Sequence, residues 1–264
     1  MEPPKSHLPS PPPLRGPHTI PFEGVEGIQA WDIEPRAGEL HLEISRERPP
    51  APTDAVIAQW NKLLADNPRM YDGGVLSVLS FDPEHNIVHA RRDSFQRLTV
   101  QPKVPTGVRL FAVTAALTAH DSTGREYILL GRRGSNTRVF GGLWEIGPSG
   151  GVGLPPSNIV RLSYHDIAAS LREEISEEIG LELPALMQGT PVAYLRDHIA
   201  FSDDLLIRYS LGLLDDVSHL ARPRNWEYSE VLWLPTDTVS AFDTPETIAA
   251  TRAAFRMLGW LERT

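Results

Sequence analysis

The sequence contains no cysteine, which excludes disulfide bonds, thiolate metal ligands and catalysis by a cysteine nucleophile. It has no apolar run long enough to span a membrane, and its first residues lack the apolar core of a secretory signal. Basic residues are in deficit: 25 Lys and Arg oppose 34 Asp and Glu, for a formal net charge of −9. This balance argues against nucleic acid or an anionic membrane as the main partner. We therefore expect a cytoplasmic protein that acts on a small molecule.

Composition and the positions of proline-rich and turn-forming segments divide the chain into three predicted regions. The 264 residues, 41% of them hydrophobic, suffice for one or two globular domains. Residues 1–21 are rich in proline and predict a disordered tail. Residues 22–105 predict a small α+β extension, and residues 106–264 predict the main domain. We expect the extension to pack on the main domain and to wall one side of a substrate pocket.

Periodicity predicts the elements of these regions. In the extension we expect strands over 40–45, 74–81 and 86–91, and a helix that Thr53 caps and Asn67-Pro68 ends. In the main domain we expect strands over 110–117, 127–130, 192–195, 205–213 and 231–234, and a last helix opened by Thr244-Pro245-Glu246. Strands on both sides of a central helix predict an α/β/α sandwich within an α+β protein.

The stretch 166–181, DIAASLREEISEEIGL, carries the clearest functional signal. It reads as a helix with Asp166 as N-cap and Gly180 just past its end. Ile167, Ala168, Leu171, Ile175 and Ile179 form its apolar stripe. Glutamates fall at 174, 177 and 178, so their side chains converge on one patch at the border of that stripe.

This acidic patch is poorly designed for stability. Glu173 faces Glu177 and Glu174 faces Glu178 at like-charge spacing, which costs roughly 0.2–0.5 kcal/mol for each pair. The acids also occupy the end of the helix where its dipole disfavours negative charge. A divalent cation would remove both penalties, because carboxylates are natural ligands of Mg²⁺. An ordinary solvated acidic face is the alternative.

The run EEISEEIGL resembles the second half of the Nudix box, G-x5-E-x7-R-E-U-x-E-E-x-G-U, in which U is aliphatic. The matching residues are Glu174, Ile175, Glu177, Glu178, Gly180 and Leu181. Upstream, YILLGRRG (127–134) and GGLWEIGPSGG (141–151) are similar to the strand and glycine-rich loop that precede the box. Two features depart from the pattern. Glu173 occupies the arginine position, and residues 154–164 look like an insertion that leaves the x5-E position without a match.

The resemblance implies a Nudix-type sandwich and a hydrolase that cleaves nucleoside diphosphates linked to another group. It implies Mg²⁺, with Mn²⁺ as an alternative, held by Glu174, Glu177 and Glu178. Glu174 and Glu178 are then also catalytic candidates, with Glu174 a ligand or general base. The carbonyl of Gly150 or Gly151 would add a ligand, and both glycines would let backbone approach phosphates. Glu173 cannot replace the arginine of the box because its charge is opposite. We therefore expect a cation from elsewhere to orient the glutamates, either Arg172 after a local twist or one from the insertion, or else a lower affinity for metal.

Weaker candidates lie outside the box. The stretch AFSDDLLI (200–207) is similar to a loop and strand of nucleotide-sugar members of the family, which makes Asp204 a catalytic candidate. Arg132 and Arg133 follow a predicted strand and are candidates for phosphate binding, because guanidinium groups bind phosphate in bidentate fashion. The likeness of residues 55–68 to the same members favours a UDP-sugar, cleaved to UMP and sugar 1-phosphate. ADP-ribose, another nucleoside diphosphate, or a ligand sensor without activity are the alternatives.

Overall fold

The computed structural model describes residues 22–33 and 39–263, so the predicted proline-rich tail lies outside the described residues. The strands are β1 Ile28–Asp32, β2 His41–Ser45, β3 Gly74–Asp82, β4 Ile87–Ser94, β5 Leu110–His120, β6 Glu126–Arg133, β7 Trp144–Ile146, β8 Ser149–Gly151, β9 Arg161–Ser163, β10 Thr190–Asp197, β11 Ser202–Leu213 and β12 Tyr228–Pro235. The helices are α1 Asp54–Asp66, α2 Phe95–Val100, α3 Tyr164–Ile179, α4 Leu214–Val217, the 3₁₀ helix η1 Thr236–Phe242 and α5 Ala249–Met257.

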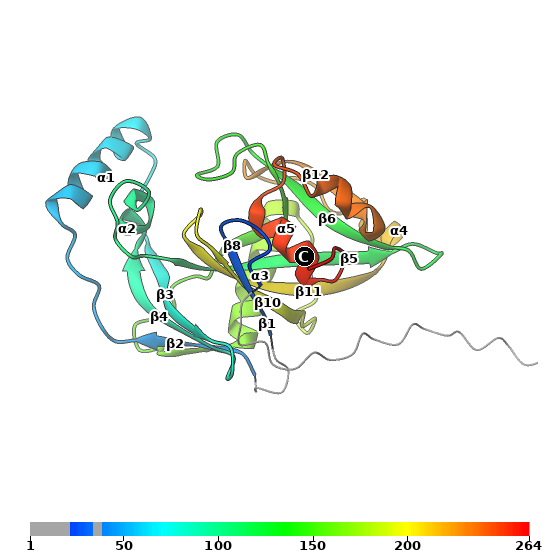
Figure 1. Ribbon diagram of the computed structural model, residues 1–264, viewed down its shortest axis with the longest axis horizontal. Helices are drawn as coiled ribbons and strands as arrows, with labels where there is room; N and C mark the ends of the chain where they lie inside the picture. Colours follow the sequence, from blue (N-terminus) through cyan, green and yellow to red (C-terminus); the bar gives the residue numbers. More distant parts are fainter. Residues whose placement is uncertain (1–21, 34–38, 264) are drawn as a thin grey trace, which may run out of the picture.

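The strands form one mixed sheet (Figure 1). Its main path runs β1-β10-β11-β5-β3-β4-β2-β9, while β6 joins β5 to β12 and β7, and β8 pairs with β5. The central pair β11–β5 is parallel, whereas β10–β11 and β5–β6 are antiparallel. Because β5 pairs with β8 at one end and β6 at the other, it joins the glycine-rich loop to the body of the sheet.

Helices α3 and α5 cover opposite faces of this sheet, so the expected α/β/α sandwich is confirmed (Figure 1). The stripe predicted on α3 packs against alternate residues of β5, including Phe111 and Val113. On the other face, Ala254 and Phe255 of α5 pack against Ala116 and Leu206. Burial of apolar surface on both faces is what holds β5 and β11 at the centre.

The first region contributes strands to the same sheet. β1 pairs with β10, β3 meets β5 at Ser77 and Leu110, and β2 pairs with β9. Strand β9 lies inside the segment 154–164, so the predicted insertion supplies an edge strand to the extension. A boundary near residue 105 stays a prediction.

Three local expectations need correction. Ser163, rather than Asp166, caps α3; Asp166 lies one turn inside and completes a reciprocal capping box with Ser163. The last helix starts at Ala249 because Thr244 to Thr247 closes a turn first. Strand β11 begins at Ser202, which places Asp204 inside a strand and not in a loop. Gly180 ends α3 with a φ of 70°, as its predicted role requires.

Across the described residues, no helix is long and apolar enough to cross a membrane.

Candidate carboxylate site and adjoining cavity

Helix α3 presents its glutamates at three different depths. Glu178 is 2% exposed, Glu174 is half-buried and Glu177 is exposed. Each residue turns about 100° around the helix, so Glu174 and Glu178 fall beside the apolar stripe and Glu177 falls outside it. Two of the three predicted ligands therefore face the protein, and the third faces solvent.

The buried pair of carboxylates has acidic neighbours. Burial and the nearby charge of Glu227 raise the pKa of Glu174 to about 7. The same two causes raise the pKa of Glu178 to about 10, with a smaller contribution from Glu145. Glu178 Oε2 is buried without a hydrogen-bond partner. An acid group buried in this way is costly to ionise unless a cation joins it.

Gly150 of β8 lies directly against Glu174. A Cβ atom added to Gly150 would lie 2.3 Å from the Glu174 carboxyl group, so a larger residue here would displace that side chain from its present position. Gly151, next in the strand, is exposed and lies beside Leu110. The glycine-rich loop thus brings backbone close to the carboxylates of α3, as the sequence predicts.

A cation whose charge acts on Glu178 comes from strand β6. Arg133 donates a hydrogen bond of 2.6 Å to Glu145 Oε1, which also accepts one of 2.7 Å from the Tyr228 hydroxyl. Attraction by Glu145 and, more weakly, by Glu178 raises the pKa of Arg133 despite its burial. Arg133 is therefore a cation whose charge acts on this cluster, whereas the sequence pointed to Arg172 or to a cation from the insertion.

The other two arginines near the motif point elsewhere. Arg172 lies near Tyr164 and Tyr209, on which its charge acts to lower their pKa values against the effect of burial. Arg132 is exposed and donates to the Gly142 carbonyl over the Trp144 ring. Of the predicted phosphate-binding pair, only Arg133 reaches the site.

The donor set has the chemistry that a hard divalent cation needs. Carboxylate oxygens and a backbone carbonyl are the expected ligands, and the unpartnered Glu178 Oε2 is available to one. Within residues 22–33 and 39–263, no three side chains of ligand type already stand together as an ion would hold them. The residues fit a cation in kind, and the side chains of Glu174, Glu177 and Glu178 would have to turn toward it.

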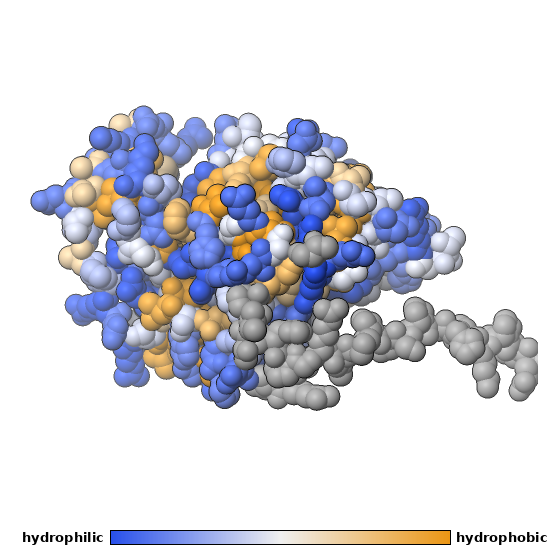
Figure 2. Space-filling view, viewed as in Figure 1, coloured by the Kyte–Doolittle hydropathy of each residue, from blue (hydrophilic) through white to orange (hydrophobic). Residues whose placement is uncertain are grey.

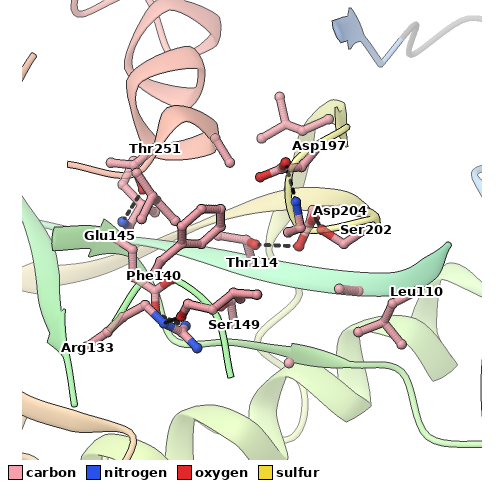
Figure 3. Close-up of a pocket in the computed structure, with 18 of the residues that line it drawn as sticks. Leu110, Thr114, Arg133, Phe140, Glu145, Ser149, Asp197, Ser202, Asp204 and Thr251 are labelled. Atoms are coloured by element: carbon pink, nitrogen blue, oxygen red, sulfur yellow. Dashed lines mark hydrogen bonds and ion pairs between the residues drawn. The ribbon is translucent and has the colours of Figure 1, made fainter. Parts of the chain in front are cut away.

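A cavity of about 210 Å³ adjoins the carboxylates. Figure 3 shows Arg133 and Glu145 at one end, and Asp197, Ser202 and Asp204 at the other. Gly150 and Glu145 line this cavity and also lie near the glutamates of α3, so they connect the cavity to the carboxylate cluster. In Figure 2, apolar surface gathers in the middle of the face that carries α5. Every lining residue comes from position 110 onward, so the extension does not wall this cavity.

Asp204 lies at the far end of the cavity, away from α3. Its carboxyl group accepts hydrogen bonds from Ser202 Oγ at 2.7 Å and from Thr114 Oγ1 at 3.4 Å. Burial raises its pKa to about 7, and Asp197 adds to the increase. The structure thus brings Asp204 to the cavity without bringing it to the glutamates.

Several residues of this site carry no signal in the sequence pattern. They are Thr114, Arg138, Glu145, Asp197, Ser202, Glu227 and Tyr228. Glu145 offered one hint, since it is a charged residue between apolar neighbours in WEI, just before the glycines. Glu227 reaches α3 only because β12 pairs with β6.

No protein-family model matches this chain, and no curated protein matches it. Among solved structures, it is similar to a MutT protein from Methanosarcina mazei, with 18% identity over 57% of this chain and 94% of that one, and a TM-score of 0.40. The NUDIX domain of Shewanella oneidensis NrtR, solved with ADP ribose, has 17% identity over 61% and 94%, with a TM-score of 0.40. A mutT/nudix family protein from Listeria innocua has 15% identity over 57% and 91%, with a TM-score of 0.41. Similarities this weak assign neither a family nor a function to the chain.

Proposed function

We propose that the protein is a Nudix-type, metal-dependent hydrolase that cleaves the diphosphate of a nucleoside diphosphate linked to a second group. The observation that carries the proposal is the buried carboxyl group of Glu178, whose Oε2 has no hydrogen-bond partner, close to Glu174, which in turn lies against Gly150. A structural acid would be paired with a cation or bonded at both oxygens. A bound Mg²⁺ or Mn²⁺ would neutralise the diphosphate and make water a better nucleophile.

The residues divide the work by position. Glu174 and Glu178 would hold the cation, with Glu177 turning in from solvent and the Gly150 or Gly151 carbonyl adding a ligand. Arg133 holds Glu145 beneath the cluster and supplies a compensating positive charge. Glu174 is alternatively the group that would take a proton from the attacking water. The backbone of β8 lets phosphate oxygens approach without a side chain in the way.

For the second group we propose a sugar, with UDP-glucose or UDP-galactose as the first substrates to try and UMP and sugar 1-phosphate as products. The support is the resemblance of residues 200–207 to nucleotide-sugar members of the family, together with a cavity beside the carboxylates that has Asp197, Ser202 and Asp204 at one end. UTP should react poorly because it has no sugar to place there.

The test is hydrolysis of a panel of nucleotide sugars, ADP-ribose and nucleoside triphosphates with Mg²⁺ or Mn²⁺. Glu178→Gln should remove most of the activity, because an amide is a weaker ligand than a carboxylate, while the exposed Glu173→Gln should retain it. Near-normal turnover by the Glu178 variant would refute the site.

The panel also separates the alternatives. Faster turnover of ADP-ribose or of triphosphates than of any UDP-sugar would refute the substrate class and leave the hydrolase in place. Metal-dependent binding without hydrolysis of any member of the panel would favour a ligand sensor.

A further inference from the structure

The cavity described above has charges of opposite sign at different depths. Asp197 is 1% exposed and Ser202 is 8% exposed, so they form the floor together with Asp204. Arg138, from the loop between β6 and β7, is exposed at the rim. The cavity is smaller than the roughly 300–1,000 Å³ of a site that encloses a whole drug-sized ligand. It suits one part of a longer molecule.

The floor selects for groups that donate hydrogen bonds. Asp197 Oδ1 accepts from the backbone amides of Ile199 and Ala200, at 2.6 and 2.8 Å, which fixes the carboxyl group in place. Ser202 and Thr114 hydroxyls hold Asp204 in turn. Carboxyl oxygens accept hydrogen bonds from hydroxyl groups, and to the extent that the two acids are ionised they also repel phosphate.

The rim selects for an anion. Within the described chain, Arg138 has no hydrogen bond or ion pair, whereas Arg133, five residues earlier in the sequence, is paired with Glu145. Although part of the side chain reaches solvent, the protein atoms packed around its guanidinium group and repulsion from Arg133 lower the pKa of Arg138, and attraction by Asp197 offsets this only in part. An unpaired guanidinium group in this position is free to bind a phosphate.

Building on the proposed function, we infer that this cavity is the sugar-phosphate subsite, in which Arg138 binds the phosphate next to the sugar and Asp197 and Asp204 bind sugar hydroxyls. Gly150 and Glu145 join the cavity to the α3 carboxylates, Arg138 lines the cavity, and Asp197 and Asp204 lie at the end away from Glu145. The diphosphate lies toward α3, and the hydroxyl-bearing group fills the floor. Asp204 then acts in binding.

The experiment measures equilibrium binding of glucose 1-phosphate, galactose 1-phosphate, UMP and inorganic phosphate to the full-length protein by calorimetry. Three variants are compared. Arg138→Met removes the rim charge, and Asp197→Asn keeps an oxygen for the two backbone amides while replacing the other acceptor with a donor. Arg125→Met is the control, because the exposed Arg125 side chain contacts Asp237 and the Tyr127 ring and does not line the cavity.

We expect Arg138→Met and Asp197→Asn each to weaken hexose 1-phosphate binding at least about tenfold, or about 1.4 kcal/mol. UMP binding should stay as in the wild type, and Arg125→Met should bind all four ligands normally. Inorganic phosphate should bind more weakly to the Arg138 variant but no more weakly to the Asp197 variant, which separates the rim from the floor. Melting temperatures check that the Asp197 variant is folded, and Arg138→Met tests the proposal independently of it.

Two results would overturn the inference. Loss of UMP binding with intact hexose 1-phosphate binding would mean that the cavity holds the nucleoside. Unchanged binding of every ligand by the Arg138 variant would mean that the cavity does not take part in ligand binding. Failure of the proposed function looks different: hexose 1-phosphate would still bind in an Arg138-dependent way while no nucleotide sugar is hydrolysed. A Michaelis constant raised by Asp204→Asn with an unchanged kcat would further place Asp204 in binding.

Discussion

Asp203 and Asp204 are neighbours on β11 with opposite surroundings. Asp203 is fully buried on the α3 side, where Arg109 donates at 2.7 Å, Arg196 at 2.7 Å and the Tyr194 hydroxyl at 2.6 Å. Asp204 faces the other side of the sheet and receives only two hydroxyl groups. Successive side chains of a strand point to opposite faces of the sheet. Two adjacent residues can therefore differ completely, with Asp203 paired with arginines and Asp204 without a cationic partner among the described residues.

The same contrast recurs among the glutamates. Glu145 is paired with Arg133 and Tyr228, whereas Glu178 keeps an oxygen without a partner. Removing one partner of a buried pair is costly, because it leaves the other group without compensation. A buried acid that is left unpaired lowers stability, and its retention points to a ligand that completes it. The two kinds of acid should therefore respond oppositely to substitution.

The largest effect is expected at Asp203. Replacing it with alanine leaves Arg109 and Arg196 without their shared anion in a buried place, and we expect a loss of about 3–5 kcal/mol in the free energy of unfolding. Urea denaturation of Asp203→Ala measures this loss. A loss below about 1 kcal/mol, the size seen for surface pairs, would contradict the structural role.

Asp204→Asn should do the reverse, and only at neutral and higher pH. The pKa of Asp204 in the folded protein is about 7, above the ordinary value of 3.8, so the folded state binds the extra proton. Ionisation therefore costs stability progressively as the pH rises from 4 to 7, at about 1.4 kcal/mol for each pKa unit. Asparagine avoids this cost.

The variant should accordingly match the wild type in stability near pH 4 and exceed it at pH 8, by an amount on the order of 1–4 kcal/mol. Urea denaturation at both pH values, with the same buffers for both proteins, gives the difference. If Asp204→Asn were less stable than the wild type at pH 8, Asp204 would stabilise the fold as a paired acid, as Asp203 does.

A smaller effect is expected at Gly150. Alanine there would push a Cβ atom into the Glu174 carboxyl group, so Gly150→Ala should cost about 1–3 kcal/mol in stability. Gly153 provides the control, because a Cβ atom built there meets no neighbouring atom within 4 Å. Thermal unfolding compares Gly150→Ala with Gly153→Ala. Equal melting temperatures for the two variants would contradict a close contact between β8 and α3.

The sequence predicted the parts of the site that depend on local pattern. The apolar stripe and the αL glycine placed α3, and the 100° step placed Glu174 and Glu178 at its buried border. The capping residue was wrong by three positions, because Ser163 and Asp166 form a reciprocal pair and either residue can be taken for the cap.

Contacts that depend on strand register could not be predicted. Arg133 and Glu145 meet because β6 and β7 pair with Gly131 opposite Glu145, and Tyr228 arrives from β12 on the other side of β6. No spacing in the chain encodes these meetings. The aspartates illustrate the same limit, since adjacent identical residues gain different neighbours from the strands and loops packed on each face.

The most direct test of the central claim is metal-dependent stabilisation. A cation that binds only the folded protein raises its stability by about 2.7 kcal/mol at a hundredfold excess over Kd, which moves the melting temperature by several degrees. Thermal unfolding is measured with increasing Mg²⁺ or Mn²⁺ for the wild type, Glu178→Gln and the exposed control Glu173→Gln. We expect the shift in the wild type and in the Glu173 variant, and its loss in the Glu178 variant. An equal shift in all three proteins, or no shift in the wild type, would contradict a metal site at the buried carboxylate.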